Sequence, residues 1–170
     1  MVRFREPAKV KINMAAQLPD IIVIDGECHD LYSNPLEQYW VANRIRRPSF
    51  ISSVDCKRGY VATWELKNNH LFLKTITGEY EKTYFYFWKR IKPCTLKSVL
   101  KKSSLNNLAA TWFTGKIRIP KGNRILYVHH EYESRFEQEM ILTIEQGKVV
   151  KSIVLDYTQE TLHVVKNDRY

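Results

Sequence analysis

The middle of this sequence lacks negative charge. Residues 82–130 contain no aspartate or glutamate, but they contain eleven lysines and arginines. By contrast, residues 1–81 hold eleven bases against ten acids, and residues 131–170 hold five bases against eight acids. Because the net charge of +9 comes almost entirely from one segment, we expect that segment to form a surface for an acidic partner.

Long apolar runs and closely spaced cysteines are also missing. No stretch of about 18 apolar residues occurs, and charges interrupt the N-terminal sequence where a signal peptide has an unbroken apolar core. Cys28, Cys56 and Cys94 are widely spaced, so they form no zinc or redox motif, and we expect reduced thiols. These features favour a cytoplasmic protein with no membrane partner.

Catalytic motifs are absent as well. The sequence has no nucleophile elbow, zinc-protease motif, phosphate-binding loop or dinucleotide fingerprint. The best polar cluster is His129, His130, Glu131 and Glu133, in which a strand would place His129, Glu131 and Glu133 on one side. A structural or surface role is favoured over catalysis, so we expect no catalytic residue, metal or cofactor.

Turn residues between apolar and β-branched runs predict four hairpins. The hydrophobic content of 44% is sufficient for a continuous core. Asp25 and Gly26 predict a type I′ turn, because both positions tolerate positive φ. The other predicted turns are residues 67–70, 120–123 and 145–148, each flanked by strand-forming sequences.

Two segments instead have helical patterns. Asn34, followed by Pro35 and Glu37, predicts a helix from Asn34 to about Arg46, and Thr95 predicts the cap of a second short helix. The sequence therefore predicts one mainly β domain over residues 1–170: an antiparallel curved sheet, sandwich or small barrel of about four hairpins with one or two short helices. Residues 1–19 are interpreted as an extended N-terminal arm, and residues 82–108 as a basic aromatic strand followed by a short helix.

An aromatic run lies within the acid-free segment, at residues 84–88. Strand alternation would place Tyr84, Tyr86 and Trp88 on one face and direct Phe85 and Phe87 into the core. Aromatic rings beside cations are typical of proteins that stack bases and neutralise phosphates, although cross-strand packing is the more common role of such rings. The candidate nucleic-acid or anion site comprises Tyr84, Tyr86, Trp88, Lys89, Arg90, Lys92, Lys116, Arg118, Lys121 and Arg124.

Several segments outside the aromatic run form a distinctive pattern. Residues 112–122, beginning Trp-Phe-Thr-Gly, are followed by residues 126–129 and 132–137, and residues 34–37, 47–48 and 58–65 belong to the same pattern. The pattern resembles that of a family of small bacterial proteins of uncharacterised function and covers roughly residues 20–157. The resemblance implies a bacterial or phage-borne cytosolic protein and carries no activity with it. Residues 83–92 match it least well.

Three functions agree with these features. The favoured one is a non-enzymatic binding module whose basic, aromatic face engages an acidic partner, with RNA or DNA preferred over an acidic protein. The first alternative is a protein-interaction component, such as an immunity or antitoxin-like inhibitor that fits a toxin with an acidic cleft. The weaker alternative is a small hydrolase that uses His129 and Glu131. The sequence does not predict the oligomeric state.

Overall fold

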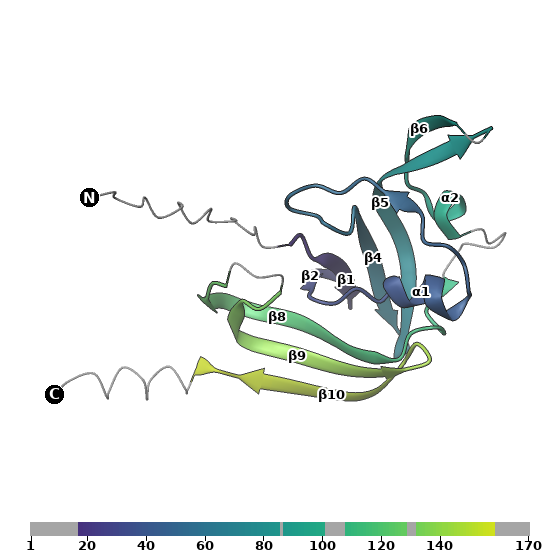
Figure 1. The fold of residues 1–170 in the computed structure, drawn as a ribbon. Helices are drawn as coiled ribbons and strands as arrows, with labels where there is room; N and C mark the ends of the chain where they lie inside the picture. Colours follow the sequence, from purple (N-terminus) through teal and green to yellow (C-terminus); the bar gives the residue numbers. More distant parts are fainter. Residues whose placement is uncertain (1–16, 86, 101–107, 129–131, 159–170) are drawn as a thin grey trace, which may run out of the picture.

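The computed structural model describes residues 17–85, 87–100, 108–128 and 132–158 (Figure 1). The described part is mainly β, as the sequence predicts. Its helices are α1 (Glu37–Ala42) and α2 (Leu96–Leu100). Its strands are β1 (Asp20–Ile24), β2 (Glu27–Leu31), β3 (Ser49–Phe50), β4 (Tyr60–Lys67), β5 (His70–Tyr84), β6 (Trp88–Pro93), β7 (Leu108–Ala109), β8 (Gly115–Leu126), β9 (Arg135–Glu145) and β10 (Lys148–Asp156).

The strands form a curved, nearly closed sheet with a barrel-like shape. Along the sheet the order is β2-β1-β4-β5-β10-β9-β8, and all neighbours are antiparallel except β1 and β4. Next to the end of β2, the Tyr32 N–H donates to the Arg118 carbonyl on β8, at 2.8 Å, so the first and last strands meet. On the other side, β10 pairs with β5 only at Lys148 and His70, which leaves the barrel open there.

Three of the four predicted hairpins are confirmed. They join β1 to β2, β4 to β5 and β9 to β10, and each has a two-residue turn. Both turn residues have positive φ in every case: Asp25 and Gly26, Asn68 and Asn69, Gln146 and Gly147. This conformation matches the twist of the flanking strands, so the turn residues set the strand register.

The predicted hairpin around residues 120–123 is wrong. These residues lie within β8, which continues from Gly115 to Leu126 beside β9, with register shifts after Lys121 and Arg124. Gly122 has φ +75° and the Asn123 N–H donates to Glu137 Oε2 at 2.9 Å. The glycine and the glutamate therefore accommodate a bulge in the strand at a sequence that also suits a turn.

The helices are short. The Tyr39 and Trp40 side chains of α1 are buried, but α1 begins at Glu37 without a side-chain cap and ends at Ala42, well before Arg46. Instead of capping the helix, the Asn34 side chain accepts a hydrogen bond from the Tyr132 hydroxyl, at 3.1 Å. For α2 the predicted cap is confirmed, because the Ser98 N–H donates to Thr95 Oγ1 at 3.1 Å. Neither helix is long and apolar enough to cross a membrane.

A buried ion pair lies inside one end of the barrel. Asp20 of β1 is fully buried, and Arg58, just before β4, donates to its Oδ1 at 2.8 Å. The Ala62 N–H and the Trp64 indole N–H donate to the same carboxylate, at 2.9 and 3.1 Å. Arg58 also donates to the Tyr132 hydroxyl, at 2.6 Å. Burial raises the pKa of Asp20, and the Arg58 guanidinium opposes that rise.

Replacing Arg58 with methionine should destabilise the protein strongly. The Arg58→Met variant leaves Asp20 buried without its counter-ion, so we expect the free energy of unfolding to fall by about 3–5 kcal/mol. Urea denaturation followed by circular dichroism measures the change. Arg46→Met is the matched control, because Arg46 is exposed and its replacement should change stability by less than about 0.5 kcal/mol. Equal stability of the two variants would contradict a stabilising role for the ion pair.

The interior tyrosines should make stability fall at high pH. Burial, reinforced by the Glu37 carboxylate, raises the pKa of Tyr60 well above its ordinary value of 10. Above pH 10 the unfolded chain loses this proton while the folded chain retains it, so the free energy of unfolding decreases by about 1.4 kcal/mol per pH unit for each such proton. Urea denaturation at several pH values on both sides of pH 10 measures this decrease. The free energy of unfolding should fall more steeply with pH for the unmodified protein than for the Tyr60→Phe variant. Identical pH dependence would contradict the assignment.

Candidate nucleic-acid interface

The outer part of β5 and all of β6 form a hairpin that stands out from the barrel (Figure 1). At Gly78, β5 leaves β4 and continues beside β6; this glycine has φ +141°, and a Cβ there would lie 2.6 Å from the Gly59 carbonyl oxygen. A glycine is therefore required where the strand changes partners. Every residue of β6 is exposed, whereas Tyr80 of β5 is 8% exposed and belongs to the core. The hairpin therefore presents both faces only beyond Tyr80.

One face of this hairpin carries cations and aromatic rings. The register pairs Tyr84 with Trp88, Lys82 with Arg90, and Tyr80 with Lys92. Directly paired residues point to the same side of a sheet, and alternate residues along a strand share that side. We call the set Lys82, Tyr84, Trp88, Arg90 and Lys92 the cationic-aromatic face.

The carboxylates of the hairpin lie on the opposite face. Glu79 and Glu81 occupy the odd-numbered positions of β5, and Glu81 pairs in register with Ile91. Lys89 projects to this opposite face and forms an ion pair with Glu81, at 3.0 Å. The structure thus neutralises Lys89, whereas no carboxylate of the hairpin shares the side of Lys82, Arg90 and Lys92.

Two lysines of the cationic-aromatic face lie close to the Tyr84 ring. The Lys82 and Lys92 ammonium groups lie 5.2 and 5.6 Å from the centre of this ring. A hydrogen bond with Lys92 lowers the pKa of the Tyr84 hydroxyl, and the same bond raises the pKa of Lys92. Because Lys82 and Arg90 are directly opposed like charges, which destabilise a strand pair, the face is arranged unfavourably for folding alone.

The tip of the hairpin differs from the prediction. Phe85 and Phe87 were expected in the core, but they are 82% and 75% exposed. The reason is that the chain reverses at Phe85, which has φ +47°, and the hairpin projects beyond the barrel. A phenylalanine in the left-handed region is strained. Packing of the exposed Phe85 ring does not compensate for this strain.

A cavity of about 270 Å³ opens at this end of the hairpin. Its lining consists of Tyr84, Phe85, Trp88 and Arg90. Three aromatic side chains and one guanidinium therefore surround a single space on the cationic-aromatic face.

The predicted cations of β8 lie elsewhere. Lys116, Arg118, Lys121 and Arg124 belong to β8, which runs through the lower half of the barrel in Figure 1, whereas β6 is at its upper right. Arg124 packs on the Tyr127 ring, with 4.4 Å from its guanidinium carbon to the ring centre. The acid-free segment is thus divided between two parts of the molecule.

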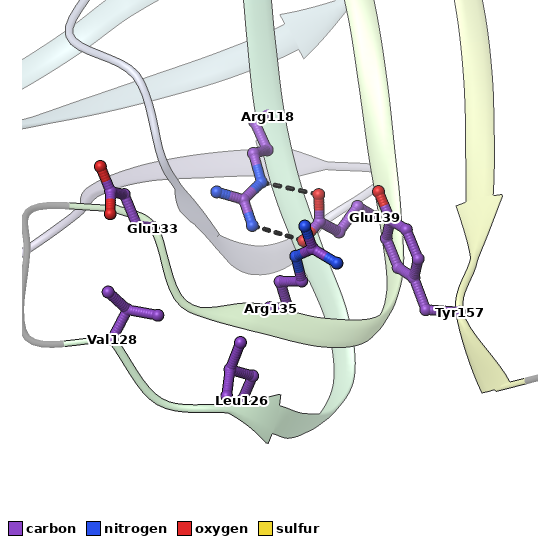
Figure 2. Close-up of a pocket in the computed structure, with 7 residues that line it drawn as sticks. All are labelled: Arg118, Leu126, Val128, Glu133, Arg135, Glu139 and Tyr157. Carbon is purple, nitrogen blue, oxygen red and sulfur yellow. Dashed lines mark hydrogen bonds and ion pairs between the residues drawn. The ribbon is translucent and has the colours of Figure 1, made fainter. Parts of the chain in front are cut away.

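Arg118 has an internal role. Its guanidinium donates to both carboxylate oxygens of Glu139 and to the backbone carbonyls of Tyr132 and Ser134. Figure 2 shows this ion pair at the side of a cavity of about 450 Å³, where Arg135 lies beside Tyr157. Because four protein oxygens accept hydrogen bonds from the five N–H donors of Arg118, this side chain is a poor candidate for an external anion.

Some predicted residues lie outside the described residues. They are Tyr86 of the aromatic run and His129, His130 and Glu131 of the polar cluster. Among the described residues, no group of three or more histidine, cysteine, aspartate or glutamate side chains could hold a metal ion.

Two residues of the interface were missing from the predicted set: Lys82 and Phe85. Lys82 joins the face only through its pairing with Arg90, and no glycine, asparagine or proline near Phe85 marks a turn. An aromatic run without turn residues predicts one continuous strand, which hides the cross-strand pairing.

Comparison with protein-family models, curated proteins and solved structures finds no match for this chain.

Replacing Phe85 with glycine should not destabilise the fold. The Phe85→Gly variant relieves a left-handed conformation and removes an exposed ring, so we expect the free energy of unfolding to stay constant or rise by up to about 1 kcal/mol. Urea denaturation measures it, with Phe113→Ala as the buried comparison, for which a loss of about 3–5 kcal/mol is expected. A large loss for Phe85→Gly would mean that the ring supports the fold.

Proposed function

We propose that this chain is a non-enzymatic module that binds nucleic acid through the cationic-aromatic face of the β5–β6 hairpin. The observation that carries the proposal is the sorting of charge across the hairpin: Lys82, Arg90 and Lys92 share one side, while Glu79 and Glu81 occupy the other. An anionic ligand on that side relieves the repulsion between Lys82 and Arg90, and this favours binding.

The rings on the same side favour nucleic acid over an acidic protein. A protein partner supplies carboxylates, which match the cations but make no special use of Tyr84 and Trp88. Nucleic acid supplies phosphates together with flat base faces, and aromatic side chains beside cations are the usual platform for both. A cytoplasmic location is part of the proposal, because such ligands occur there.

The size of the face sets an expected salt dependence. Three cations that neutralise three phosphates give a slope of about −2 for log affinity against log salt on a single strand. Between about 50 and 200 mM salt, the affinity should then fall roughly 20-fold. This is weaker than the change expected if the whole acid-free segment bound phosphate.

Removing two cations from the face should flatten this dependence. In the Lys82→Gln/Arg90→Gln variant, the slope of log affinity against log salt should become shallower by about 1.4, and binding at low salt should be weaker. Fluorescence anisotropy of a labelled oligothymidylate, titrated at several salt concentrations, measures both quantities.

The matched control removes the same charge from another strand. Lys148 and Lys151 are exposed on β10, so Lys148→Gln/Lys151→Gln should preserve the slope. An equal loss for both double variants would show that net charge alone drives binding, and it would contradict the assignment to the hairpin. If vesicles of anionic phosphatidylserine bind the protein and neither RNA nor DNA does, the nucleic-acid proposal fails.

A further inference from the structure

The cavity at the end of the hairpin has a lining suited to a flat, unsaturated ring. Tyr84 and Trp88 are directly opposed across the two strands, Phe85 adds a third ring, and Arg90 contributes a planar guanidinium. Paired residues of an antiparallel sheet have Cβ atoms about 4.5–5.5 Å apart, so the Tyr84 and Trp88 side chains start as neighbours. Guanidinium and aromatic planes both stack on nucleobases.

We infer that this cavity receives an unpaired base and that the ligand is therefore single-stranded nucleic acid; the inference rests on the proposed function. In a duplex the faces of the bases are stacked on one another, and side chains reach only their edges in the grooves. The cavity is lined by planar groups, which bind a base by stacking on its face. Such stacking requires a base that is not already stacked within a duplex.

The cations next to the cavity lie where the backbone of the same strand would pass. Lys82 and Arg90 are two residues along the hairpin from Tyr84 and Trp88. Two residues of an antiparallel strand span about 6.8 Å, so a base in the cavity has a cation pair one short step away for its phosphates. Stacking and charge neutralisation thus act on one continuous ligand.

Because stacking platforms recognise every base by its face, we expect little sequence preference. Specific readout needs several hydrogen-bonding side chains that match base edges. The side chains that line the cavity offer only the Arg90 guanidinium, the Tyr84 hydroxyl and the Trp88 indole N–H for such bonds. The ligand class is therefore single-stranded RNA or DNA of mixed sequence.

Trp88 provides a direct probe of the cavity. It is 65% exposed, whereas Trp40 and Trp64 are 3% and 0% exposed and Trp112 is partly buried against the core. Added oligonucleotide should therefore change mainly the Trp88 fluorescence. Oligothymidylate should quench this emission and protect Trp88 from acrylamide, and a hairpin-free duplex of the same length should do neither at equal concentration.

Variants separate stacking from charge. Tyr84→Ala and Trp88→Ala should each weaken binding of oligothymidylate by roughly 5- to 150-fold, the range for an aromatic platform under one base. Trp88→Phe should retain most of the affinity, because it keeps a ring. Ile91→Ala is the control for lost apolar surface, since Ile91 is 60% exposed on the opposite face.

The outcomes distinguish this inference from the proposed function. If single strands and duplex bind equally and Trp88→Ala binds like the unmodified protein, while Lys82→Gln/Arg90→Gln still weakens binding, the base cavity is overturned and nucleic-acid binding stands. If neither form of nucleic acid binds at low salt, both proposals are overturned. A loss for Ile91→Ala equal to that for Trp88→Ala would also overturn the base cavity, because general apolar contact would then explain the affinity.

Discussion

The buried ion pair between Asp20 and Arg58 is the interaction on which the rest of the barrel depends. Asp20 belongs to β1, its backbone and indole donors belong to β4, and Arg58 reaches the Tyr132 hydroxyl beyond β8. The Asp20 carboxylate therefore holds β1 and β4 together and, through Arg58, connects them to the segment between β8 and β9. Such a pair, once buried, is stable only while both members and their hydrogen bonds are present. This requirement makes the arrangement specific.

Some basic residues are paired with carboxylates, and others lie on a face without them. The net charge does not distinguish these two groups. Arg47, Arg58 and Arg118 each donate to a carboxylate, from Glu37, Asp20 and Glu139 respectively. Glu139 lies outside the acid-free segment, so Arg118, which belongs to that segment, is neutralised by a carboxylate from another strand. Lys82, Arg90 and Lys92 differ because the hairpin places its carboxylates on the other side. A small, sorted group of charges therefore distinguishes the hairpin, which the total of +9 does not.

The sequence predicted those parts of the fold that local backbone preferences decide. Asp25 and Gly26 need positive φ in a tight hairpin, so their turn could be recognised from two residues. Gly122 also has positive φ, but there the same preference serves a bulge, because Glu137 on β9 caps the Asn123 N–H. The choice between a turn and a bulge depends on a residue fourteen positions away, which local sequence does not reveal.

The candidate interface illustrates the same limit. Alternation correctly placed Tyr84 and Trp88 on one side, because both alternation in one strand and direct pairing across a hairpin give that result. It misplaced Phe85 and Phe87 because the reversal at Phe85 has no turn residue. The distinctive segments of the sequence include Asn34, Arg58, Trp64 and Tyr132, whose side chains take part in the hydrogen-bond network around Asp20. In this structure these four residues serve the fold.

A projecting hairpin with opposed cations links binding to local stability. Repulsion between Lys82 and Arg90 acts in the free protein, and an anion placed between them removes it, so ligand binding should stabilise the hairpin more than the barrel. In the barrel, by contrast, Arg58 and Arg118 are each paired with a buried carboxylate, that of Asp20 and that of Glu139. Separation of the two regions at Gly78 lets the chain keep a strained, charged tip on a fold held by buried contacts. The same separation explains why the features that specify the barrel say little about the ligand.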